Sequence, residues 1–84
     1  MKAVLTYETG NSTMDEIMSV FPRHKQYLEN FKKENVIHGI GPFKDRKGSM
    51  GIFPDVETAE KFASNDPFVL EGIAKNVQIR EWVD

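Results

Sequence analysis

The stretch SNDPFVLEG, residues 64–72, decides how the last third of this chain folds. Proline has a fixed φ and no N–H group, so Pro67 suits the first turn of a helix. Asp66 stands directly before it, where a carboxylate can accept hydrogen bonds from the free N–H groups of that turn. Gly72 can end the short helix in a left-handed conformation. The simplest interpretation of Asp66 is therefore a helix N-cap.

A second interpretation of Asp66 joins it to His24. Residues 22–34 predict a helix whose apolar stripe includes Leu28 and Phe31, and His24 is the one polar group on that stripe. A histidine in such a position is more often a packed, hydrogen-bonded core residue than a catalyst. A carboxylate partner, however, would set the imidazole as a base or acid near neutral pH. The residues alone leave both interpretations open.

The remaining segments predict an alternating order of strands and helices. The predicted strands are residues 2–8, 36–43, 49–53 and 76–83. The predicted helices are residues 14–20, 22–34 and 57–65, with Pro22 dividing the first two, followed by the short helix after Asp66. The order β-α-β-β-α-β is the ferredoxin-like plan, an α+β fold with a four-stranded antiparallel sheet and helices on one face. Residues 1–84 form a single domain of this kind.

One face of such a sheet is left uncovered by the helices. The first strand places Leu5 and Tyr7 on one face and Val4 and Thr6 on the other, so both faces carry apolar groups. A chain of this size buries only about 60% of its unfolded surface, and the absence of cysteine excludes disulfides. We therefore expect a homodimer in which the uncovered sheet faces pack together.

Composition and charge narrow the classes of function. A net charge of −2 gives no general attraction to nucleic acid or to an anionic membrane. The stretch KGSMGIF, residues 47–53, begins like an RNA-recognition motif but has Ser49 and Gly51 where stacking rings are needed. No apolar run approaches the roughly 20 residues of a membrane span. With no cysteine and two histidines, we expect no metal site and no cofactor. We also expect a cytoplasmic location.

The order and spacing of several short motifs resemble the YCII (YciI-like) family. In chain order these are HxxYL at 24–28, GPF at 41–43, GS at 48–49, DPF at 66–68 with a glycine at 72, and VxIxxW at 77–82. The resemblance covers nearly the whole chain. It implies a dimeric α/β barrel with a pocket that holds a catalytic histidine and aspartate, here His24 and Asp66. The chain departs from the family where an arginine is expected before Pro22, because MSVF stands at 18–21. Arg23 is the candidate substitute.

Two hypotheses for the function follow. In the first, the protein is a small-molecule enzyme of the lyase or isomerase type, in which His24 moves a proton and Asp66 orients the imidazole and stabilises its charge. Four further residues would then hold the substrate: Ser49, Gly41, Pro42 and Arg23. In the second, the protein is a non-catalytic dimeric module that binds a metabolite or a protein partner, and Asp66 is only a cap.

Overall fold

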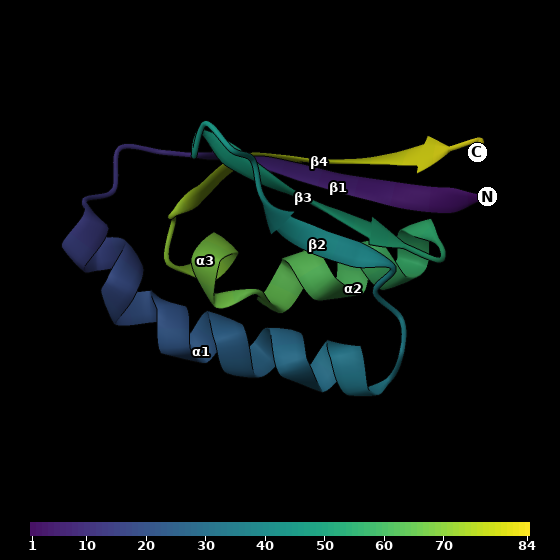
Figure 1. Cartoon of the computed structure of the whole chain (residues 1–84), viewed down its shortest axis with the longest axis horizontal. Helices are drawn as coiled ribbons and strands as arrows, with labels where there is room; N and C mark the ends of the chain where they lie inside the picture. Colours follow the sequence, from purple (N-terminus) through teal and green to yellow (C-terminus); the bar gives the residue numbers. More distant parts are fainter.

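Four strands form one antiparallel sheet in the computed structural model, which describes residues 1–84. In chain order they are β1 Lys2–Thr9, β2 Gly39–Pro42, β3 Gly48–Phe53 and β4 Ala74–Trp82. Strands β1 and β3 lie in the middle of the sheet, and β2 and β4 form its edges. The helices are α1 Met14–Lys33, α2 Val56–Asn65 and α3 Pro67–Leu70, and all three lie on the same side of the sheet (Figure 1). This is the α+β, ferredoxin-like arrangement that the sequence predicts.

The central strand β1 sets the register of the sheet. Leu5 pairs with Gly51 of β3 on one side and with Ile79 of β4 on the other, and Tyr7 pairs with Ser49. Leu5 and Tyr7 are buried beneath the helices, as the alternation predicts. Gly48 is required where β3 meets β1, because a Cβ at this position would collide with the Tyr7 carbonyl oxygen. Gly48 therefore lets the two central strands lie close together beside the Tyr7–Ser49 pair.

The edge strands differ from their predicted bounds. The sequence predicts a strand from residue 36, but β2 begins at Gly39. Directly before β2, the backbone N–H of His38 donates a hydrogen bond to the Ile52 carbonyl at 2.8 Å. Strand β4 begins at Ala74, two residues before its predicted start. Asn76 has a φ of 50°, and the pairing of β4 with β1 shifts at this point. This irregularity is a β-bulge, and asparagine tolerates the left-handed conformation better than most residues.

Helix α1 is where the prediction from sequence is wrong. The sequence predicts two helical segments divided at Pro22, but α1 runs through this residue without a break. Val20 and His24 lie on either side of the proline and are both buried, so packing on both sides of Pro22 supports a helix that continues through it. Pro22 cannot bond to the Met18 carbonyl, and both residues are exposed. Water can therefore satisfy the carbonyl that the proline leaves without a partner.

The hydrophobic core lies between the sheet and the helices, with Phe62 of α2 at its centre. The Phe62 ring meets Phe31 of α1 edge-on at 5.1 Å between centroids and Phe53 of β3 at 5.2 Å. Phe53, Phe62 and Leu5 are fully buried. The Tyr27 hydroxyl donates to the Phe62 carbonyl at 2.8 Å. These contacts tie the second half of α1 to α2.

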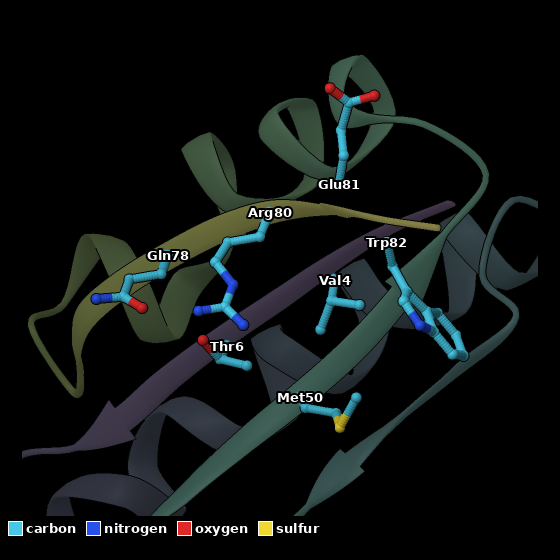
Figure 2. A pocket seen from close by; sticks show the side chains of 7 residues that line it. All are labelled: Val4, Thr6, Met50, Gln78, Arg80, Glu81 and Trp82. Atoms are coloured by element: carbon cyan, nitrogen blue, oxygen red, sulfur yellow. The ribbon is translucent and has the colours of Figure 1, made fainter. Parts of the chain in front are cut away.

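The sheet face opposite the helices is open. A hollow of about 450 Å³ on this face is lined by residues from three strands: Val4, Thr6, Met50, Gln78, Arg80, Glu81 and Trp82. Arg80 extends over the sheet toward Thr6, and Trp82 stands at the end of β4 (Figure 2). The Trp82 side chain is 43% exposed. No part of the chain covers this face, which we call the outer face. None of the helices combines the length and the apolar character that crossing a membrane requires.

Candidate active site

His24 and Asp66 come together where α1 packs against the start of α3. The two side chains are joined by a contact of 2.7 Å between His24 Nδ1 and Asp66 Oδ1. Asp66 is fully buried and His24 is 8% exposed. Asp66 ends α2 and begins α3 with extended backbone angles, φ −63° and ψ 124°. The sharp change of direction between the two helices places its carboxylate against α1.

Asp66 acts as a helix cap at the same time. The oxygen that contacts His24 also accepts the backbone N–H of Phe68 at 3.0 Å. The two interpretations of the sequence are therefore not alternatives, because one carboxylate oxygen meets both groups. Since this oxygen accepts, neutral His24 carries its proton on Nδ1 and keeps a lone pair on Nε2. An imidazole held in this way presents Nε2 as a base.

Phe68 fixes the imidazole from a second direction. Its ring is stacked on the His24 ring, with 4.0 Å between centroids and 13° between planes. Phe21 lies at 6.3 Å from His24 between ring centroids, at a tilted angle. The first turn of α3 therefore supplies both the carboxylate that orients the imidazole and the flat surface against which it packs.

The second oxygen of Asp66 influences its surroundings through charge. Oδ2 is buried and has no hydrogen-bond partner. Burial, and after it the charge of Asp66, raises the pKa of Tyr7 to about 12, against the opposing effect of a hydrogen bond with the Ser49 side chain. Burial and the same charge raise the pKa of Tyr27 to about 12. Both tyrosines are therefore neutral O–H donors at neutral pH.

A cavity of about 350 Å³ opens beside His24, between α1, α3 and the sheet. Its apolar walls include Phe21, Leu28 and Phe68. Its polar lining consists of Tyr7, Thr9, His24, Lys25 and Ser49. No aspartate or glutamate lines it, and nowhere in the protein do three His, Asp or Glu side chains gather as metal ligands would. The cavity thus presents hydroxyl groups, an imidazole and an ammonium group on an apolar background.

Three of the four predicted substrate-binding residues lie at this cavity. Ser49, Gly41 and Pro42 all line it together with His24. Arg23 does not line it, and its guanidinium group lies 3.6 Å from the Glu71 carboxylate on the surface. Successive residues of a helix point about 100° apart, so the residues on either side of His24 face different ways. Lys25 occupies the position at the cavity that the sequence analysis assigns to Arg23.

Of the 13 residues that line the cavity, nine are not predicted as site residues from the sequence, and four of these bear on its chemistry: Tyr7, Thr9, Lys25 and Phe68. Strand alternation correctly places Tyr7 on the same face as Leu5. The same alternation is found for ordinary core residues, so it does not identify Tyr7 as a cavity residue. The neighbour that distinguishes Tyr7 is Ser49, its partner across β1 and β3. Phe68 follows Asp66 by two positions and is the last residue of the DPF motif at 66–68, which is the signal that could have found it.

Fold and cavity together define a class, namely small ferredoxin-like proteins with a cavity between sheet and helices. The sequence matches the YCII-related domain over residues 1–83, so the chain belongs to the YCII family. This agrees with the resemblance carried by the short motifs. No curated protein matches the chain.

Among solved structures, the fold is similar to that of 5-chloro-2-hydroxyhydroquinone dehydrochlorinase (TftG) from Burkholderia phenoliruptrix, in complex with 2,5-dihydroxybenzoquinone. The TM-score is 0.80 at 22% sequence identity, and the match covers 99% of this chain and 94% of the other. This likeness shows that the two proteins share a fold.

Proposed function

We propose that this protein is a small-molecule enzyme of the lyase or isomerase type, with His24 as the acid and base. The observation that carries the proposal is the 2.7 Å contact that joins His24 to a fully buried Asp66 at the wall of a cavity. A buried carboxylate that orients an imidazole beside a ligand-sized space is the arrangement that proton transfer needs.

The proposed reaction starts with the lone pair on His24 Nε2. This atom takes a proton from a substrate carbon next to a carbonyl group, and the electron pair of the broken C–H bond forms an enolate. In an isomerase the proton returns at another position. In a lyase the enolate re-forms the carbonyl, a C=C bond forms between the α and β carbons, and the bond from the β carbon to the leaving group breaks with its electrons going to that group. The imidazolium ion of His24 then gives its proton to the leaving group or to water. Asp66 keeps the imidazole oriented and stabilises the imidazolium ion between the two steps, with the unpaired charge of Oδ2 close by.

The structural neighbour supports this proposal. Its name describes the removal of chloride from a hydroxylated ring, and it binds 2,5-dihydroxybenzoquinone. For the present chain we propose substrates of similar size, because a cavity of about 350 Å³ lies at the lower end of the range of small-molecule sites.

Proton exchange in heavy water tests the proposal with a panel of candidate compounds. Small cyclic ketones and hydroxylated quinones are incubated with the protein, and the loss of their C–H signals is followed by proton NMR. We expect the wild type to accelerate exchange or elimination for members of this panel, and His24→Gln to abolish the effect. We expect Asp66→Asn to lower the rate about 10²- to 10⁴-fold, as the loss of an orienting carboxylate does elsewhere.

His38→Gln is the matched control, because the second histidine is exposed and lies outside the cavity. It should exchange protons at the wild-type rate. Binding of panel compounds without any exchange, unchanged in His24→Gln, would contradict the proposal. That result would favour the second hypothesis, a dimeric module that binds a metabolite without catalysis.

We further propose that the protein is a homodimer that buries the outer face. This face carries Val4, Met50 and Trp82, which the chain itself leaves uncovered (Figure 2). A second copy presents the same surface, so a two-fold axis through the middle of the sheet would cover both faces at once.

A further inference from the structure

Lys25 is the only permanently charged side chain that lines the cavity beside His24. It lies four residues after Phe21 and three residues before Leu28 on α1, and all three line the cavity because such spacings place side chains on one side of a helix. Lys25 is exposed, whereas His24 is buried. The ammonium group therefore lies where the cavity meets solvent, and the imidazole lies farther in.

The charge of Lys25 is not neutralised within the chain. The protein has three ion pairs, and Lys25 takes part in none of them. Arg23, on the other side of His24, pairs with Glu71 on the surface. No carboxylate lines the cavity. The cavity therefore offers a ligand one unpaired ammonium group.

The buried carboxylate of Asp66 determines where a negative charge of the ligand can lie. Its Oδ2 atom has no hydrogen-bond partner. Burial, and after it the charge of Asp66, raises the pKa of Tyr7 to about 12, so the effect of this charge reaches the cavity wall formed by the sheet. A second negative charge deep in the cavity would be repelled. The open end beside Lys25 is where an anionic group is attracted.

The lining is suited to a single negative charge rather than to a phosphate group. Phosphates in proteins are commonly bound by free N–H groups at the start of a helix or by arginine. The start of α3 has no free N–H group to offer, because Asp66 accepts the Phe68 N–H through its side chain and those of Val69 and Leu70 through its carbonyl. No arginine lines the cavity. One ammonium group beside apolar walls matches a monocarboxylate with an apolar body.

We propose that Lys25 binds the carboxylate of the substrate at the mouth of the cavity, and that the substrate is a small keto acid. The carboxylate lies outward, the apolar part contacts Phe21 and Leu28, and a C–H bond next to the carbonyl group faces His24 Nε2. One small molecule can reach both residues, because the Cα atoms of His24 and Lys25 are about 3.8 Å apart. The inference rests on the proposed function and adds to it the class of the substrate and its orientation. Lys25 determines specificity and takes no part in the proton transfer.

Binding of matched acids and amides tests this assignment. The probes are α-ketobutyrate, α-ketovalerate and α-ketoisocaproate, each compared with its neutral amide of nearly the same shape. Dissociation constants are measured by NMR titration of the wild type, Lys25→Met and Lys25→Glu. We expect the wild type to prefer the acids and Lys25→Met to bind them about 3- to 10-fold more weakly, between the effects of an exposed ion pair and of a hydrogen bond to a charged group. Lys25→Glu should bind the acids more weakly still, and neither variant should change the affinity for the amides.

Lys32→Met is the matched control. Lys32 is exposed on the same helix and lies outside the cavity, so the variant has the same net charge as Lys25→Met. It should bind the acids with the affinity of the wild type. Higher ionic strength should weaken the binding of acids to the wild type and affect Lys25→Met less. A lysine with a merely structural role would change the affinity for acids and amides together.

The outcomes of this test are distinct from those of the exchange experiment. Equal affinity of the wild type and Lys25→Met for the acids, or an equal loss in Lys32→Met, overturns the role of Lys25. A wild type that binds none of the acids more tightly than its amide overturns the assigned substrate class. Both results can occur while His24 catalyses proton exchange in other compounds. If exchange is absent but the acids are bound through Lys25, the proposed catalysis fails and the carboxylate site stands.

Discussion

The ring of Phe68 lies flat against the imidazole of His24, two residues after the aspartate that holds the same imidazole by its edge. One turn of α3 therefore controls both the plane and the rotation of the histidine. Because Asp66 also accepts the N–H of Phe68, the helix start and the site are formed by the same contacts. Substitutions in this turn should therefore affect the site and the stability of the fold to different extents.

Phe68→Leu should impair the site more than the fold. Leucine keeps most of the apolar volume of a half-buried side chain, so we expect the free energy of unfolding to fall by less than about 1.5 kcal/mol. The flat surface against His24 is lost, and proton exchange should slow about 10- to 100-fold as the imidazole moves. Urea denaturation and the exchange assay measure the two effects. Phe43→Leu, at a side chain that is 42% exposed and outside the cavity, should change neither.

Substitutions of Asp66 should separate its two roles. Asparagine can still cap α3, so Asp66→Asn should change the free energy of unfolding by less than about 1 kcal/mol. Alanine removes the cap and the partner of His24, and we expect a loss of about 2–4 kcal/mol. Nitrogen-15 NMR of the His24 ring should show the Nδ1–H tautomer in the wild type and a mixture in Asp66→Asn. An unchanged tautomer would remove the orienting role of Asp66.

Phe31→Ala should be among the most damaging single changes in the core. Phe31 packs edge-on against Phe62 and ties α1 to α2, and its truncation should cost about 3–5 kcal/mol of unfolding free energy. Phe43→Ala removes the same atoms from an exposed site and should change stability by less than about 0.5 kcal/mol. Chemical denaturation of the two variants measures the difference. Similar values for both would mean that α1 does not pack as described.

Stability at high pH should report the environment of Tyr7. Its folded pKa of about 12 lies above the ordinary value of 10, so the unfolded chain loses this proton first. The contribution is fully present below pH 10 and is lost as the pH rises from 10 to 12, and it amounts to about 2–3 kcal/mol. Tyr7→Phe should therefore lose less stability than the wild type between these pH values, as measured by urea denaturation. Parallel pH curves for the two proteins would contradict the shift.

The outer face should mediate dimerisation. We expect light scattering to give twice the chain mass of 9.6 kDa at micromolar concentration. Trp82→Lys places a charge on the outer face and should shift the protein toward the monomer. Met18→Lys, at an exposed position of α1 on the opposite side of the molecule, should leave the dimer intact. A wild type that remains at the monomer mass would rule out the proposed interface.

The sequence predicts the fold well because its signals are local. Pro67 after an aspartate starts α3, and the alternation in β1 assigns Leu5 and Tyr7 to the helix side. The pair is suggested by the position of His24 on an apolar helical stripe, by the position of Asp66 at a helix end, and by the resemblance to the YCII family. The structure then places the two side chains in contact.

What the sequence could not predict depends on packing and register. The continuity of α1 across Pro22 follows from burial on both sides of the proline, which a local rule does not see. The pairing of Tyr7 with Ser49 needs the register of two strands about 40 residues apart, and no turn connects them directly. The choice of Lys25 over Arg23 depends on which side of α1 faces the cavity.

Asp66 both caps α3 and contacts His24, and this combination affects how the chain can evolve. A descendant that no longer needed the chemistry would still be selected for a stable fold, and the start of α3 would keep the aspartate in place. His24 packs against Phe68, but its ring hydrogen-bonds no backbone group, so the start of α3 depends on it less than on Asp66. If the proposed catalysis is lost in a related protein, the first substitution is therefore expected at His24, and an unchanged Asp66 shows only that α3 still begins there.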